Sequence, residues 1–553
     1  MSDSPAPILR RFVTVAGRQT HLRQTGSGPA VLVLHQTPQS SATMEPMLRL
    51  LPGVTAIAPD SPGFGLSDPL PGRRWDMARL ADWLSGLMDA LGIARAGLIG
   101  QHTGAAIAAD FARRHPGRAT SLAADGLPAF TAAERATILP HQLPRFRPAT
   151  DGAHLVCAWS RFRDGWMFFP RSDHRLARRR ALDLPPPELI QTWQLMELLR
   201  SGESYRAVYP GVFAWDGAAA LRGLSCPALI GADAGDQLFD HLDRLPDGLP
   251  GVTFLRTAVG DRAGLWRRLA DFTLSHAGAA TPPAPSRTGA ASGPRAYVRL
   301  TGDRHVLIHR REGPAAPVVL LHGAGSAGEV ELARSPPLRA CLALDLPGHG
   351  NSDPPARSSF DPAALARDVG AVLDALGLDR VSLRGRGLGA AVGVELARAR
   401  PDRIGRLRVG ELALLSETEA ETWTSRLIPD LAPCPYGTHL VRLWHALRDD
   451  QMFWPRFDTR AAAARRIEPM LDADHLARRF FAALRCADLH AAHAAWLRWD
   501  VRSRMAGLNP PPEIAAVPGD GWARDAAALA ALAGGRVVSA ASDGDGLDLP
   551  DAP

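Results

Sequence analysis

Residues 100–104, Gly-Gln-His-Thr-Gly, combine residue types and a spacing that are suited to chemistry. Small residues on both sides of a central one are typical of a sharp strand-to-helix turn that presents the central side chain at the end of a sheet. Such a turn usually presents a serine, cysteine or aspartate nucleophile, whereas here it presents His102. The N-terminus of a helix favours a neutral imidazole, which suits a general base or a nucleophile. We therefore expect His102 to be catalytic; the alternative is a decayed turn in which His102 fills the floor of a pocket.

The same turn occurs a second time, at residues 385–389, where the central residue is Gly387 and offers no side chain. Two further segments repeat: residues 60–68 (DSPGFGLSD) match 345–353 (DLPGHGNSD), and residues 167–171 (MFFPR) match 452–456 (MFWPR). All three pairs are separated by the same 285 positions. A constant offset over such a length indicates one fold that has been duplicated.

The boundary between the copies lies at residues 277–294, which are rich in Ala, Gly, Pro, Ser and Thr and predict a linker. We expect a first domain over residues 1–276 and a degenerate second domain over residues 295–553. Amphipathic, aromatic-rich stretches at about 130–222 and about 415–508 predict a helical cap inserted in each copy. Because the cap motifs are duplicated, we expect the copies to pack as an intramolecular pseudo-dimer.

The elements that must position His102 can be traced by their patterning. Residues 30–34 and 54–58 are continuous apolar runs, which are typical of strands buried on both faces. Residues 76–91 show a helical period that stops at Gly92. Residues 98–99 complete a strand before the turn, and the Ala-rich residues 105–114 predict a helix after it. Strands that alternate with helices indicate an α/β fold with a parallel sheet.

This order of parts resembles the α/β-hydrolase superfamily, and the first copy is most similar to its epoxide hydrolase and haloalkane dehalogenase-like branch. The resemblance rests on the His35 turn after an early strand, the motif at residues 60–68, the turn at residues 100–104, and the cap. It implies two tandem α/β-hydrolase-like domains, each a mostly parallel, doubly wound sheet with a helical cap insertion. It also implies a hydrolase or lyase that needs no cofactor.

The resemblance implies roles for residues around His102, which stands at the nucleophile position. The family's acid follows a late strand, so Asp236 or Asp233 is the candidate here; Asp125 is a third residue that could orient the imidazole. The family's base is a histidine after the final strand, but residues 259–262 (VGDR) contain none. The family's Ser-His-Asp arrangement is therefore incomplete in the first copy, and the second copy lacks its nucleophile and base as well.

Polar residues beside the turn are candidates for binding the substrate oxygen. Gln36 and Thr37 follow His35, and we expect the Gln36 amide and the backbone N–H of Thr103 to act as oxyanion donors. Gln101 adds a further polar group next to His102.

His154 and Trp159 lie where the first cap begins and could contact a substrate. Because His439 and Trp444 occupy the matching places in the copy with the empty turn, a packing role is the favoured alternative.

Composition excludes several other functions. The 63 basic and 57 acidic residues give a net charge of +6 that is spread along the chain, so we expect no nucleic-acid partner. We find no 18-residue apolar span and therefore expect no membrane partner. The start of the sequence lacks signal-peptide features, and a cytoplasmic location is the default. Five scattered cysteines and the lack of a phosphate or dinucleotide loop predict neither metal nor cofactor.

Two functions follow from these patterns. The first is a hydrolase or lyase that acts on a small, largely apolar ester, lactone or carbon–carbon substrate, with the second copy a pseudo-domain. The second is a non-catalytic ligand-binding or scaffold protein on the same fold. An aspartate within hydrogen-bond reach of His102 in an open pocket would favour the first.

Overall fold

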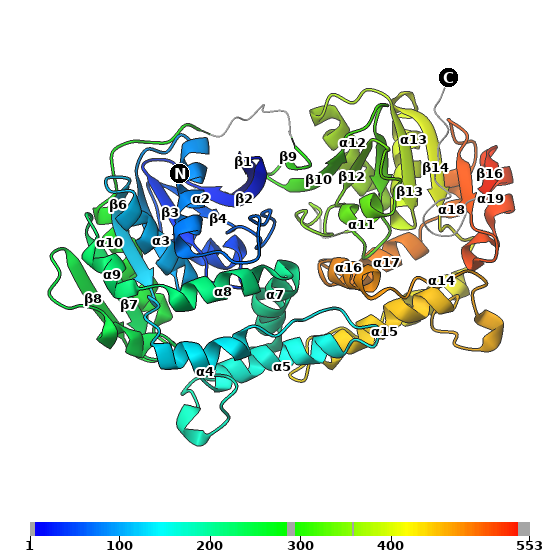
Figure 1. The fold of residues 1–553 in the computed structure, drawn as a ribbon. Coiled ribbons are helices and arrows are strands. Elements are labelled where there is room, and N and C mark those ends of the chain that lie inside the picture. The colour runs from blue at the N-terminus through cyan, green and yellow to red at the C-terminus, as the bar shows by residue number, and fades with distance from the viewer. Residues whose placement is uncertain (1–5, 285–292, 357–358, 540–553) are drawn as a thin grey trace. The chain divides into compact units, whose positions relative to one another are not determined.

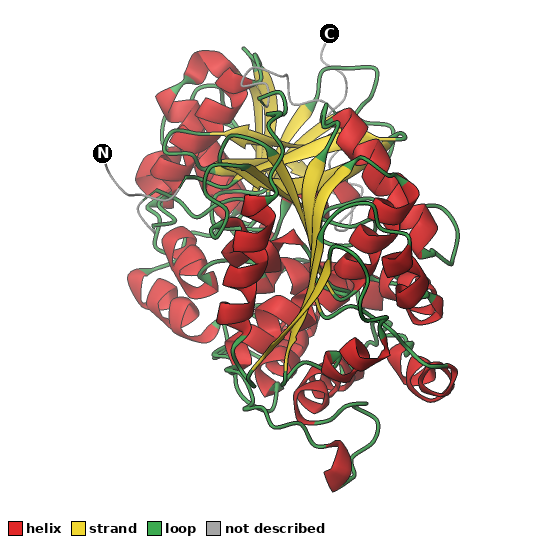
Figure 2. Cartoon of the chain, turned by 90° about the vertical axis from the view of Figure 1, so that its left-hand side faces the viewer, coloured by secondary structure: helices red, strands yellow, loops and turns green. Residues whose placement is uncertain are grey.

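The computed structural model describes residues 6–284, 293–356 and 359–539. The chain divides into two compact units, each built around its own eight-stranded sheet. One comprises Met1–Arg147, His154–Arg287 and Pro433–Gly437; the other comprises Pro148–Ala153, Thr288–Ala432 and Thr438–Pro553. Figure 2 shows helices on both sides of the strands, the layering of an α/β fold. The predicted linker at 277–294 falls partly outside the described residues.

The sheet of the first unit has the strand order β1-β2-β4-β3-β5-β6-β7-β8. Strands β3 to β8 run parallel, whereas β1 and β2 join antiparallel at one edge. The strands are β1 (Leu9–Val15), β2 (Arg18–Thr25), β3 (Ala30–Leu34), β4 (Thr55–Pro59), β5 (Ala96–Gln101), β6 (Ala119–Asp125), β7 (Ala228–Asp233) and β8 (Val252–Thr257). Sequence patterning did not predict β1 and β2, whose polar and charged residues hide the alternation of a half-buried strand.

Helices cover both faces of this first sheet. They are α1 (Glu45–Leu48), α2 (Met77–Ala90), α3 (Thr103–Arg114) and α10 (Arg262–Ser275). The cap between β6 and β7 contains α4 (Ala132–Gln142), α5 (Ala153–Met167), α6 (Pro187–Leu189), α7 (Met196–Ser201), α8 (Ser204–Ala214) and α9 (Gly217–Arg222). Helix α3 packs on β5 and β6, and α10 packs on β5, β6 and β7 (Figure 1). The predicted helix at residues 76–91 is thus α2, and the one at residues 105–114 begins two residues earlier, as α3.

The second sheet repeats the same order, as β16-β15-β14-β13-β11-β12-β10-β9. Its strands are β9 (Arg295–Arg299), β10 (His305–Arg311), β11 (Val318–Leu321), β12 (Cys341–Leu344), β13 (Val381–Arg386), β14 (Ile404–Gly410), β15 (Glu513–Ala516) and β16 (Arg536–Ser539). Its helices are α11 (Gly328–Ala333), α12 (Pro362–Ala375), α13 (Leu388–Ala399), α14 (Glu417–Arg426), α15 (Thr438–Met452), α16 (Ala473–Leu484), α17 (Leu489–Leu497), α18 (Val501–Met505) and α19 (Ala526–Ala533). The two tandem α/β domains that the repeat predicted are confirmed.

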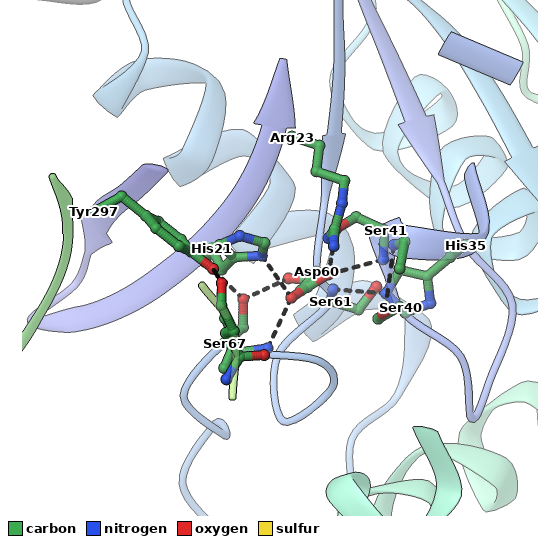
Figure 3. Close-up of polar contacts among 12 residues, drawn as sticks. His21, Arg23, His35, Ser40, Ser41, Asp60, Ser61, Ser67 and Tyr297 are labelled. Carbon is green, nitrogen blue, oxygen red and sulfur yellow. Dashed lines mark hydrogen bonds and ion pairs between the residues drawn. The ribbon is translucent and has the colours of Figure 1, made fainter. Parts of the chain in front are cut away.

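Asp60, the first residue of a repeated motif, forms polar contacts with several surrounding residues (Figure 3). Its carboxylate accepts hydrogen bonds from the backbone N–H groups of Ser41 (2.8 Å) and Leu66 (2.7 Å) and contacts Nδ1 of His21 at 2.8 Å. Burial alone would raise the pKa of Asp60, but His21 and Arg23 hold it well below its usual range. Asp60 is therefore a structural anchor for the loops that follow β3 and β4.

Candidate active site

The carboxyl ends of four parallel strands bring the polar residues of the first unit together. In the sheet, Leu34 of β3 pairs with Gly100 of β5, and Gln101 pairs with Asp125 of β6. Asp125 pairs in turn with Gly231 of β7. The residues that follow these strand ends therefore emerge at one edge of the sheet, where α/β proteins bind their ligands.

His102 occupies a strained backbone position between β5 and α3. Its φ of 46° and ψ of −108° lie where residues other than glycine are uncommon. Its N–H donates to the carbonyl of Asp125 (2.9 Å), and its carbonyl accepts from the N–H of Ala106 (3.0 Å). A Cβ at Gly104 would collide with the carbonyl oxygens of Leu34 and His35, so only glycine fits there. Strain of this kind costs about 1–3 kcal/mol and clusters at functional sites.

The imidazole of His102 contacts the carboxylate of Asp236. Nε2 lies 2.9 Å from Oδ2 and 3.0 Å from Oδ1, and the two side chains are 10% and 2% exposed. Asp236 also accepts from the N–H of Leu238 (2.8 Å) and from Nη2 of Arg262 (3.2 Å). Burial alone would raise the pKa of Asp236, but His102 and Arg262 hold it well below its usual range. Asp236 is therefore an ionised partner that fixes the ring of His102.

The partners of the ring define its tautomer. A carboxylate only accepts hydrogen bonds, so Nε2 carries the proton that faces Asp236. Nδ1 then holds the lone pair, and the amide Nε2 of Gln237 lies 3.4 Å from it. Nδ1 is consequently the ring atom that can accept a proton or attack an electrophile.

Arg262, the first residue of α10, is part of this site, a role that sequence reasoning missed. It lies in the late loop where the resemblance places a histidine. Its Nη2 contacts Asp236 at 3.2 Å, its Nε lies 3.9 Å from Oδ2 of Asp233, and its side chain is 42% exposed. Burial opposes its charge, yet Asp125, Asp236 and Asp233 raise the pKa of Arg262. Residues 259–262 hold no histidine, and their arginine pairs with the acid instead.

Asp125 and Asp233 were alternatives to Asp236 for orienting His102, and the structure gives their side chains other contacts. Oδ2 of Asp125 accepts from Nε2 of Gln101 (3.1 Å) and from the indole Nε1 of Trp266 (2.9 Å). Burial raises the pKa of Asp125, and the nearby Asp236 adds to the rise. Oδ1 of Asp233 accepts from the N–H of Gly235 (2.9 Å). Gln101 and Trp266 thus hold Asp125, and the loop after β7 holds Asp233.

The expected oxyanion donors lie on the rim after β3 and at the start of α3. The carbonyl of Gln36 accepts from Nδ1 of His35 and from the N–H of Gln39, each at 2.9 Å. The carbonyl of Thr37 accepts from the hydroxyl of Tyr209 in α8 (3.2 Å). Thr103 begins α3, so its N–H is one of those that a helix leaves without an acceptor of its own. The Gln36 amide and the Thr103 N–H stay candidate donors.

The two cap residues are buried in α5. Trp159 is 2% exposed, and its indole Nε1 donates to the carbonyl of Pro435, which belongs to the same compact unit (3.1 Å). His154 is 8% exposed. These contacts support the packing role for Trp159 over contact with a substrate.

A surface cavity of about 440 Å³ opens elsewhere on the first unit. It is bordered by β1, β2 and α2, with Arg18, Arg79 and Trp83 among its lining residues. His102 and its polar neighbours are not part of that lining, so this cavity is not the site built around the imidazole.

The second unit keeps the strained turn without its side chain. Gly387 has a φ of 50° and a ψ of −118°, close to the values at His102. A Cβ at Gly387 would lie 3.6 Å from the ring of Trp496, which itself packs at 5.3 Å between ring centroids on Trp522. The ring of Trp496 therefore lies against this turn, and Gly387 presents no side chain at its centre.

Among residues 6–284, 293–356 and 359–539, no three His, Cys, Asp or Glu side chains are grouped so as to hold a metal ion. In the same part of the chain, every helix is too short or too polar to cross a membrane.

The α/β hydrolase fold family model matches residues 29–259 and 316–409, and the chain belongs to that family. Among curated relatives, 2-hydroxymuconate semialdehyde hydrolase of Pseudomonas putida is 32% identical over 120 residues, which cover 21% of this chain and 43% of the relative. Epoxide hydrolase of Caballeronia sordidicola is 33% identical over 120 residues, 21% of this chain and 36% of the relative. The chain thus spans about two fifths of the length of these relatives.

Solved structures similar to this chain include two enzymes. Epoxide hydrolase A from Mycobacterium thermoresistibile is 21% identical and has a TM-score of 0.38; the match covers 48% of this chain and 98% of that one. A thermophilic esterase from Thermogutta terrifontis is 20% identical and has a TM-score of 0.37; the match covers 49% of this chain and 100% of that one.

Proposed function

We propose that the first copy is a hydrolase or lyase without a cofactor, in which His102 and Asp236 carry the chemistry. Its substrate is a small, largely apolar ester, lactone or compound with a scissile carbon–carbon bond. The single observation that carries this proposal is the 2.9 Å contact between Nε2 of His102 and Asp236, made from a strained backbone turn. The relatives named as hydrolases support the class of reaction, and the substrate is our own inference.

In this proposal Nδ1 of His102 acts as general base or as nucleophile. As a base, Nδ1 takes a proton from water while the oxygen of that water attacks the carbonyl carbon, and it then returns the proton to the leaving group. Asp236 keeps the ring oriented and stabilises the imidazolium that forms. The N–H of Thr103 and the amide of Gln36 are the donors proposed for the negative charge that develops on the carbonyl oxygen.

The experiment that tests this proposal is turnover of a mass-spectrometric panel of esters, thioesters, lactones and β-diketones by the purified full chain. His102→Ala and His102→Gln are compared with the unmodified protein. We expect both variants to lose on the order of a hundredfold or more, the typical contribution of a general base. Equal turnover by all three proteins would show that the chemistry does not use His102.

A non-catalytic ligand-binding protein is the second candidate, and one observation favours it. Arg262 stands where the family has its histidine base and shares Asp236 with His102. Under this alternative, panel compounds raise the melting temperature without being consumed. His102→Ala would then change the Kd of these compounds, and neither the variant nor the unmodified protein would turn them over.

A further inference from the structure

One face of the first sheet is apolar across four strands. Val33 of β3, Ile99 of β5, Ala123 of β6 and Leu229 of β7 are register neighbours, so their side chains share a face. All four belong to one buried cluster with Leu265, Leu269 and Ala270 of α10. This row is an ordinary contact between a sheet and the helix that covers it.

The equivalent row of the second sheet is charged. Leu320 of β11, Arg384 of β13, Arg408 of β14, Glu513 of β15 and Arg536 of β16 are register neighbours in the same way. We call Arg384, Arg408, Glu513 and Arg536 the charged row. By the constant offset of 285 positions, Arg384 replaces Ile99 and Arg408 replaces Ala123. Both arginines are buried, 5% and 2% exposed, whereas the side chain of Arg536 at the edge of the sheet is 70% exposed.

Positive charge exceeds negative charge around this row. Glu513 pairs with Arg408 at 2.8 Å, with Arg406 at 2.6 Å and with Arg536 at 2.5 Å. Arg386 pairs with Glu411. The groups that act on one another here comprise six guanidinium groups and three carboxylates: Arg334, Arg384, Arg386, Arg406, Arg408, Arg536, Glu331, Glu411 and Glu513.

The network leaves part of the Arg384 guanidinium without hydrogen-bond acceptors. Its Nε and Nη2 atoms are buried and have no hydrogen-bond partner in the part of the chain that the structure describes. Glu331 favours its charge, whereas burial and the surrounding Arg386, Arg334 and Arg408 lower the pKa of Arg384 to about 9. Buried N–H groups without an acceptor cost free energy, so an acceptor from outside the described chain would stabilise the Arg384 guanidinium. The planar guanidinium presents paired donors that suit an oxyanion.

We propose that the second copy binds a small multivalent oxyanion, such as a phosphate group, on the charged row, with Arg384 as its principal contact. This site is distinct from the one around His102, since it lies on a sheet of the other unit. It gives the degenerate copy a role that does not require a residue at the empty turn. Its ligand is recognised through charge and paired N–H donors, so a phosphate monoester fits better than a neutral compound.

The test measures melting of the full chain against inorganic phosphate and against chloride at matched ionic strength. We expect phosphate to raise the melting temperature with the logarithm of its concentration, by about 3 °C when it reaches tenfold its Kd, and chloride to leave it lower. Arg384→Leu restores an apolar side chain like Ile99 and should abolish this response without unfolding the protein, because apolar replacements of buried charges are often tolerated. Arg175→Leu removes an exposed arginine of the first copy and should keep the response.

Two results would overturn the proposal. The first is a phosphate response that equals the chloride response at matched ionic strength. The second is a response that Arg384→Leu retains in full. Titration calorimetry on Arg384→Met provides a second reading should the leucine variant fold poorly.

Discussion

Nε2 of His102 lies 2.9 Å from Oδ2 of Asp236, although 134 positions and the whole cap separate the two residues in sequence. The contact exists because β5 and β7 end at the same edge of a parallel sheet, with β6 between them. It fixes the ring through Nε2 and leaves the lone pair of the neutral ring on Nδ1. The usual order of a catalytic triad, with the nucleophile at the turn and the histidine in the late loop, is replaced by a histidine at the turn and an arginine in the late loop.

Replacing Asp236 with Asn should lower kcat by on the order of a hundredfold or more, since the amide neither fixes the tautomer nor stabilises imidazolium. KM should change little, because Asp236 is 2% exposed and faces the protein. Steady-state kinetics on the best substrate of the panel provide the check. Asp233→Asn is the matched control, because Asp233 binds the N–H of Gly235 instead of the ring. Equal losses in both variants would mean that the contact between His102 and Asp236 is not what orients the base.

Gly126→Ala should displace the imidazole. A Cβ at Gly126 would lie 2.5 Å from Cδ2 and 2.8 Å from Nε2 of His102, and a displacement of about 1 Å at a catalytic group can cost about a hundredfold in rate. Gly117→Ala is the control, since Gly117 also has positive φ but no heavy atom within 4 Å of the added Cβ. Both variants should lose about 1 kcal/mol of stability from backbone strain. A rate that falls equally in both would show that the loss comes from strain and not from displacement of His102.

Acid should weaken the first copy through His241, which is 1% exposed and accepts a hydrogen bond from the N–H of Ala129. Burial, and then Arg244, lower the pKa of His241 to about 4. Between pH 6.5 and 4 the unfolded chain binds more protons than the folded one, so stability is complete above pH 6.5 and falls as the pH decreases. The loss from this group is about 2 kcal/mol at pH 5. Urea denaturation at pH 7.5 and 5.0 should show a smaller difference for His241→Gln, and an unchanged difference would assign the effect to other groups.

Asp60→Ala should destabilise the protein by about 3–5 kcal/mol, because it leaves the N–H groups of Ser41 and Leu66 buried without their acceptor. Asp345 accepts from the N–H groups of Gly328 and Asn351 in the second copy, so Asp345→Ala should cost a similar amount. Chemical denaturation followed by tryptophan fluorescence measures both. A change below about 1 kcal/mol in either variant would remove Asp60 and Asp345 as anchors of their loops.

The fold could be predicted from the sequence because duplication and buried-strand patterning are local signals. The apolar run at residues 30–34 is β3, and the run at 54–58 is β4 shifted by one residue. Strands β1 and β2 were not predicted because polar residues occupy both faces of a strand such as Arg18–Thr25, although it lies inside the sheet between β1 and β4. Their antiparallel pairing depends on contacts that no short window of sequence contains.

The site was harder to predict, because its parts come from five loops. His102 stood out by its place in the turn, and Asp236 was one of three acids among which sequence could not choose. The choice depends on where each carboxylate points. Gln101 and Trp266 set the direction of the Asp125 carboxylate, because both donate hydrogen bonds to it. Arg262 and Trp266 are four residues apart on α10, a spacing that puts both on one helix face. That spacing is the sequence signal that could have predicted that Arg262 and Trp266 both contact the acids beside His102.

The turns at His102 and Gly387 share one backbone conformation, although only the first has a side chain at its centre. The backbone angles differ by 4° in φ and 10° in ψ, although one copy holds an imidazole and the other a hydrogen atom. The flanking glycines and the ends of the neighbouring strands therefore set the bend, and a side chain at its centre must accept the strained backbone angles that His102 accepts. For an engineer, the second copy offers a preformed turn: a Cβ at position 387 would lie in ordinary van der Waals contact with the Trp496 ring, at 3.6 Å.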